Sequence, residues 1–152
     1  MNIKAVIKNL VNSKGISGNE NCVCETALAL LKEYCPDAYI KNGNVIGKFG
    51  SFSDNRPHIL LDAHIDQVGM IVTYITDEGF IKIGNVGGLD RRLLPAQQVT
   101  IHGSKQIKGV ICSVPPHLTK GKSSVLKIED VAIDTGYSKK EHEKIVMQGD
   151  MV

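Results

Sequence analysis

Apolar side chains recur every three or four positions along the first part of the chain. One such stretch runs from Ile3 to Val11, and a second runs from about Glu20 to Tyr34, shortly before Pro36. This spacing gathers the apolar side chains on one face of a helix, and a proline ends helices. The pattern therefore predicts two amphipathic helices.

The pattern then changes to short apolar runs between turn residues. The runs 38–40 and 44–49 lie on either side of Asn42-Gly43, a dipeptide typical of tight hairpin turns. An uninterrupted run, His58–Leu61, is interpreted as a buried strand. Helices followed by such a strand cannot bury both faces of a sheet by themselves. We therefore expect residues 1–67 to be the front of an α/β domain whose remaining strands are absent.

Short strands dominate after Val68, where we place a domain boundary. Closely spaced strands with glycine-containing turns favour a small antiparallel barrel or sandwich, so residues 68–152 are predicted to form an all-β, barrel-like domain. Ser138 and Glu141 have the spacing of a capping box and predict one helix. The expected strands are 70–75, 80–83, 97–101, 106–112 and 131–134, with a further strand starting near 146.

His64 and Asp66 follow the predicted strand His58–Leu61. Open α/β sheets place ligands at the carboxyl ends of their strands. A neutral imidazole binds zinc through one nitrogen, while its other N–H needs an acceptor that fixes its direction. His64 is thus a candidate metal ligand and Asp66 its orienting carboxylate. The alternative is an ordinary core or capped histidine.

Several motifs, in order along nearly the whole chain, resemble those of the tetrahedral, glutamyl-type aminopeptidases. These are dinuclear-metal exopeptidases, and some members are described as cellulases or endoglucanases. The motifs are Ile16–Glu20, Asn42–Gly47, Asp62–Gly69, Asp77–Phe80, Val86–Asp90, Lys108–Ile111, Pro115–Leu118, Ile133–Gly136 and Gly149–Asp150.

The resemblance implies a metal-dependent aminopeptidase, a hydrolase that removes N-terminal residues from peptides. His64 would be a terminal ligand of one of two divalent ions, zinc or cobalt, and Asp66 would be the catalytic carboxylate that holds its second nitrogen. Family members are well over twice as long as this chain, so we expect an amino-terminal fragment. One imidazole is not a complete zinc site, and the isolated chain is expected to be inactive.

Two further hypotheses concern the β domain. In the resembling family this domain makes dimer contacts, and dimers build larger assemblies, so a homodimer or higher homo-oligomer is expected; the chain could also be a non-catalytic assembly module. The second hypothesis is a nucleic-acid-binding barrel, because residues 91–128 contain seven Lys and Arg and no Asp or Glu. The same stretch contains no aromatic residue for base stacking, which disfavours nucleic acid as a partner.

The composition narrows the class of protein to which the chain can belong. Apolar residues make up 42% and charged residues 22% of the chain, values typical of globular proteins, and the net charge is +2. No apolar run has membrane-spanning length and no signal peptide is evident, so a soluble cytoplasmic protein without membrane partners is expected. The remaining histidines, which have no carboxylate at ligand spacing, are expected at the solvated surface, and the cysteines are expected to be reduced thiols. These residues are His58, His102, His117, His142, Cys22, Cys24, Cys35 and Cys112.

Overall fold

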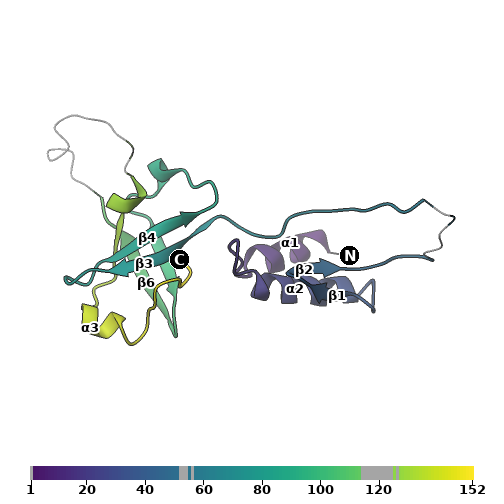
Figure 1. Ribbon diagram of the computed structural model, residues 1–152, viewed down its shortest axis with the longest axis horizontal. Helices are drawn as coiled ribbons and strands as arrows, with labels where there is room; N and C mark the ends of the chain where they lie inside the picture. Colours follow the sequence, from purple (N-terminus) through teal and green to yellow (C-terminus); the bar gives the residue numbers. More distant parts are fainter. Residues whose placement is uncertain (1, 52–54, 56, 114–124, 126) are drawn as a thin grey trace. The chain divides into compact units, whose positions relative to one another are not determined.

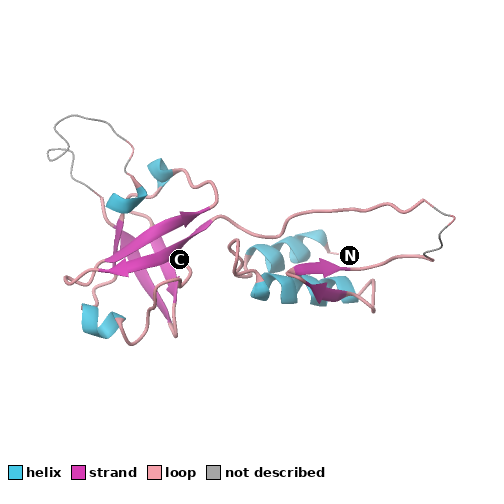
Figure 2. Cartoon of the chain, viewed as in Figure 1, coloured by secondary structure: helices cyan, strands magenta, loops and turns pink. Residues whose placement is uncertain are grey.

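In the computed structural model the chain divides between Gln67 and Val68 into two units (Figures 1 and 2). Residues 2–51, 55, 57–113, 125 and 127–152 are described. The motif Pro115–Leu118, with His117, lies outside the described residues, as do Lys120 and Lys122 of the basic stretch.

The described part of the first unit contains the two predicted helices and the predicted hairpin. Helix α1 begins after Asn2, whose side-chain oxygen accepts a hydrogen bond from the Ala5 N–H at 3.2 Å and so satisfies a donor of the first turn. The elements are α1 (Ile3–Val11), α2 (Asn21–Lys32), β1 (Tyr39–Lys41) and β2 (Asn44–Ile46). Both helix predictions are confirmed.

The connection between α1 and α2 is packed closely against α2. A Cβ on Gly15 would lie 2.3 Å from Val23 Cγ1, so only glycine fits there. The Val23 N–H donates to the Lys14 carbonyl at 3.1 Å, and the Ser13 hydroxyl donates to Thr26 Oγ1 at 2.8 Å. These contacts fix the course of the chain just before residues 16–19.

The β1–β2 hairpin turns at Asn42 and Gly43, which have φ of 51° and 74°. Two successive left-handed residues are the signature of a type I′ turn, whose twist matches that of paired strands. The strands are antiparallel, with Ile40 opposite Val45. The hairpin prediction is therefore confirmed.

The predicted buried strand His58–Leu61 is wrong as a buried, paired strand. Ile59, Leu60 and Leu61 are 85%, 88% and 91% exposed, and residues 57–66 are not part of a sheet. The run gains no strand partner among the described residues, because β1 and β2 of this unit pair only with each other. An apolar sequence specifies burial only where another element supplies the covering surface.

The second unit is built on an antiparallel sheet with the strand order β3-β4-β7-β6-β5. The pattern of strands after Val68 is confirmed, and a bulge between Val72 and Tyr74 adds local twist to β3. The strands are β3 (Gly69–Ile75), β4 (Ile81–Val86), β5 (Gln98–His102), β6 (Gln106–Ile111) and β7 (Ala132–Asp134), with the short helices η1 (Arg91–Leu93), η3 (Ile128–Asp130) and α3 (Lys139–His142).

The last residues of the chain join the two edges of this sheet. The Met70 N–H donates to the Val152 carbonyl at 3.1 Å and the Val152 N–H donates back at 2.8 Å, which pairs the segment with β3. The His102 N–H donates to the Met151 carbonyl at 2.8 Å, which pairs it with β5. The sheet therefore curls around one apolar core. This core is Met70, Val72, Ile81, Ile83, Leu94, Ile101, Ile107, Ile111, Val131, Ile133 and Val146.

The expectation that His142 is solvated is wrong. The Glu141 side chain accepts from the Ser138 N–H at 2.8 Å, so the capping box forms and starts α3 as predicted. His142 on this helix is 0% exposed, and its Nε2 lies 2.6 Å from the Thr135 hydroxyl. The charged residues beside His142 on α3 gave no indication in the sequence that this position is buried. His102 ends strand β5 and is half-buried, whereas His58 is exposed.

Candidate functional site

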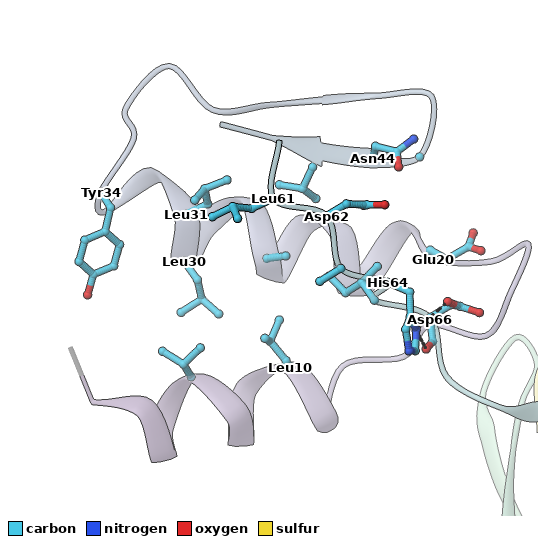
Figure 3. Close-up of a pocket in the computed structure, with 16 residues that line it drawn as sticks. Leu10, Glu20, Leu30, Leu31, Tyr34, Asn44, Leu61, Asp62, His64 and Asp66 are labelled. Atoms are coloured by element: carbon cyan, nitrogen blue, oxygen red, sulfur yellow. Dashed lines mark hydrogen bonds and ion pairs between the residues drawn. The ribbon is translucent and has the colours of Figure 1, made fainter. Parts of the chain in front are cut away.

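A pocket of about 670 Å³ lies in the first unit beside residues 61–66 (Figure 3). Part of its apolar wall comes from the two helices and includes Leu10, Leu30 and Leu31. Its polar lining residues are Glu20, Asn44, Asp62, His64 and Asp66. The extended segment 61–66 thus sets polar side chains beside an apolar hollow, the usual composition of a ligand pocket.

The side chains of His64 and Asp66 point toward each other (Figure 3). His64 Nδ1 lies 3.2 Å from Asp66 Oδ1 and also 3.2 Å from the Asp66 main-chain oxygen. Both neighbours are acceptors, which favours the tautomer of the neutral imidazole with the proton on Nδ1 and the lone pair on Nε2. The His64 side chain is 87% exposed, so Nε2 is open to a ligand.

Ser17 completes this arrangement, and the sequence analysis did not identify it. Its hydroxyl donates to Asp66 Oδ2, so the two carboxylate oxygens serve two different donors. The hydrogen bond from the Ser17 hydroxyl lowers the pKa of Asp66 below its ordinary value of 3.8; desolvation opposes it in part, and the His64 imidazole lowers the pKa further. Asp66 is therefore ionised at neutral pH. The motif Ile16–Glu20 contained the signal, but its spacing from Asp66 gave no reason to pair them.

The described residues hold no group of three or more His, Cys, Asp or Glu side chains placed to bind one metal ion. His64 offers one imidazole nitrogen with its orientation fixed, which fits the first ligand of a metal site and no more. Asp62 is exposed and lines the same pocket. All four cysteines are free thiols.

The other candidates have local structural roles. Gly87, in the motif Val86–Asp90, has φ of 77°, as expected for a turn. Asp90 accepts from the Arg92 guanidinium at 2.7 Å, and these hydrogen bonds lower the pKa of Asp90 to about 2. Lys108 donates to Thr100 at 2.8 Å. Two of the cations in the basic stretch are thus already engaged within the chain.

The family model described as M42 glutamyl aminopeptidase matches residues 43–152, which is most of the chain. The chain belongs to the M42 glutamyl aminopeptidase family. The resemblance found in the sequence motifs is thereby confirmed.

Individual M42 proteins match over almost the whole chain. The lysyl aminopeptidase of Pyrococcus furiosus is 28% identical over 142 residues, which cover 90% of this chain. The aminopeptidase APDkam598 from Desulfurococcus kamchatkensis superimposes with a TM-score of 0.86 at 31% identity, covering 97% of this chain. The TET1 peptidase of Pyrococcus horikoshii superimposes with a TM-score of 0.82 at 32% identity, covering 98% of this chain. That peptidase is described as assembling into a tetrahedron or a large octahedral shell.

These M42 relatives are much longer than the chain. It spans 40% of the lysyl aminopeptidase, 41% of APDkam598 and 45% of the TET1 peptidase. The mixed helix and sheet architecture with a curled sheet therefore corresponds to a part of the M42 fold. Within the described residues, no helix is both long and apolar enough to cross a membrane.

Proposed function

We propose that this chain contributes part of the active site of a metal-dependent aminopeptidase, a hydrolase that removes N-terminal residues from peptides. Membership of the M42 family carries the proposal, because the named relatives are aminopeptidases. The geometry at His64 and Asp66 supports it, because an imidazole with its Nδ1 proton held by a carboxylate is the standard form of a protein metal ligand.

In this proposal His64 would hold one of two divalent ions, zinc or cobalt. Such ions would supply an activated water and polarise the scissile carbonyl. Asp66 accepts a hydrogen bond from the Nδ1–H, fixes the tautomer, and would make the imidazole a better donor to the ion. Its carboxylate is ionised at neutral pH, as this role requires, because Ser17 and His64 lower its pKa.

The remaining ligands and the general base belong, in this proposal, to the part of the M42 length that the chain does not span. A catalytic zinc needs three protein ligands and an open position, and the described residues group no three candidates. We therefore expect the isolated chain to hydrolyse no aminoacyl-p-nitroanilide with added zinc or cobalt. Turnover by the chain alone would contradict the assignment.

The second unit is proposed to be the barrel-like domain through which copies of the chain associate. The dodecamer and shells described for the P. horikoshii TET1 peptidases support this role. Light scattering over a range of protein concentrations tests it, and a strict monomer at high concentration would contradict it. A cytoplasmic location belongs to the same proposal.

A chimera tests the catalytic assignment. This chain replaces the matching segment of the P. furiosus lysyl aminopeptidase, and hydrolysis of lysyl-p-nitroanilide is measured with added metal. His64→Ala is expected to abolish activity, and Asp66→Asn to reduce activity or metal affinity by about 10–100-fold, as observed for groups that orient metal ligands. His58→Ala, on the same extended segment, is the control. Equal activity of the His64→Ala and His58→Ala chimeras would overturn the role of His64.

A further inference from the structure

The structure assigns Ser17 as a positioning residue for His64, acting through Asp66. The Ser17 hydroxyl donates to Asp66 Oδ2, while Asp66 Oδ1 accepts from His64 Nδ1. Three side chains therefore form one hydrogen-bonded row that ends at the free Nε2 of His64. The role of this row in metal binding rests on the proposed function. The hydrogen bonds themselves involve only residues of this chain.

The position of Ser17 is fixed by backbone contacts on both sides. The Gln67 N–H donates to the Gly15 carbonyl at 2.7 Å, and Ile16 forms a parallel bridge with Gln67. Ile16 is 7% exposed, so the residue directly before Ser17 is anchored in the interior. The segment that carries Asp66 is thus tied to the segment that carries Ser17, although the two residues are 49 positions apart.

The turn after Ser17 adds a second restraint. Gly18 has φ of +88°, a conformation that favours glycine, and its N–H donates to Glu20 Oε1 at 2.6 Å. The Asn19 N–H closes the turn on the Ile16 carbonyl at 2.9 Å. The hydroxyl of Ser17 is therefore presented by a preformed turn rather than by a freely moving loop.

The Ser17 bond matters because His64 itself is little constrained by packing. The His64 side chain is 87% exposed, so few contacts besides its hydrogen bonds to Asp66 hold its torsions. A carboxylate with only one donor can rotate away from it. With Oδ2 held by Ser17, the second oxygen stays directed at Nδ1, and the imidazole stays in the tautomer that leaves Nε2 unprotonated.

The test measures the tautomer of His64 directly, in the metal-free chain. Two-bond ¹H–¹⁵N spectra of histidine-labelled protein, recorded at alkaline pH where imidazoles are neutral, distinguish the Nδ1–H from the Nε2–H form. The wild-type chain is expected to show mainly the Nδ1–H form for His64. In Ser17→Ala we expect a several-fold fall in the ratio of Nδ1–H to Nε2–H.

Matched variants separate the hydroxyl from effects of size and folding. Ser17→Thr keeps the hydroxyl and is expected to retain the wild-type ratio of Nδ1–H to Nε2–H. Ser17→Val has nearly the same shape as Ser17→Thr but lacks the hydroxyl, so its ratio is expected to match that of Ser17→Ala. Ser13→Ala is the control, because Ser13 donates to Asn9 and Thr26 in the same unit and not to Asp66. Amide spectra verify that each variant is folded.

An unchanged His64 ratio in both Ser17→Ala and Ser17→Val would overturn the inference, and so would a wild-type chain in which His64 favours the Nε2–H form. Neither result depends on metal or on hydrolysis. The His64→Ala chimera tests the proposed function separately, so the failure of one is distinguishable from the failure of the other.

Discussion

At the scale of single residues, the chain uses histidine in two opposite ways. His64 is 87% exposed and is oriented by polar partners, which leaves one nitrogen available to a ligand. His142 is fully buried, and its Nε2 contacts the Thr135 hydroxyl inside the second unit. The residue type alone therefore does not identify a site. The distinction lies in whether the free nitrogen faces solvent or the protein core.

The burial of His142 predicts a loss of stability of the second unit in mild acid. Burial lowers the pKa of His142 below its ordinary value of 6.5, and the Glu141 carboxylate and the Gly79 backbone oppose this only in part. The unfolded chain then binds a proton more readily than the folded chain, so stability rises with pH in this range. Stability is expected to be intact above about pH 6.5 and to fall as the pH drops from there toward the lower folded pKa.

This effect is measured by urea unfolding of the second unit, followed through its amide resonances. The pH is varied between about 5 and 8, a range that spans the ordinary histidine pKa of about 6.5. His142→Gln keeps a polar group that can contact Thr135 but does not titrate, so its stability should depend less on pH. His58→Gln changes an exposed histidine of the first unit and should leave the dependence unchanged. The explanation would be refuted if the free energy of unfolding depended on pH in the same way in the wild-type and the His142→Gln protein.

At the scale of elements, the sequence predicts what local chemistry determines. The helices α1 and α2 follow from apolar spacing, and the hairpin follows from Asn42-Gly43, because these signals act within a few residues. The exposure of Leu60 and the burial of His142 could not be predicted, because both depend on which distant element lies opposite. The contact of Ser17 with Asp66 is of the same kind, since it crosses 49 positions.

Strand β6 illustrates how tightly one element fits the next, and it gives a testable substitution. A Cβ on Gly109 would lie 2.5 Å from Ile133 Cγ2 and 3.1 Å from the Asp134 carbonyl oxygen. Gly109→Ala must therefore displace β7 from the core, and we expect it to lower the free energy of unfolding by about 1–3 kcal/mol, the usual cost of overpacking. Gly88→Ala is the control, because a Cβ there meets nothing within 4 Å. If thermal or urea unfolding gave Gly109→Ala and Gly88→Ala the same stability, this close packing would be contradicted.

At the scale of the whole chain, the two units differ in how completely they bury their apolar residues. The second unit has a continuous core, and residues 149–152 join its sheet edges. The first unit buries few apolar side chains, chiefly Ile16, Val23, Cys24, Cys35 and Ala38. It leaves Ile3, Ile7 and Val11 of α1 more than half exposed, together with the run at Ile59 to Leu61. The chain spans about two-fifths of the length of these M42 relatives.

That surface predicts how the isolated chain behaves in solution. Ile59, Leu60 and Leu61 are 85–91% exposed and lie outside any sheet, so this apolar run can pair with another copy. Besides the association proposed for the second unit, we expect a further self-association through this segment as the concentration rises, because an exposed extended apolar run is a template for strand pairing. Leu60→Lys should weaken that association by placing a charge on the apolar run.

Leu93→Lys is the matched control, since Leu93 is also exposed, at 68%, but lies in the short helix η1 of the other unit. Sedimentation velocity over a concentration series separates the two outcomes: an effect confined to Leu60→Lys assigns association to the uncovered apolar run, whereas an equal or larger effect of Leu93→Lys would assign it to the second unit.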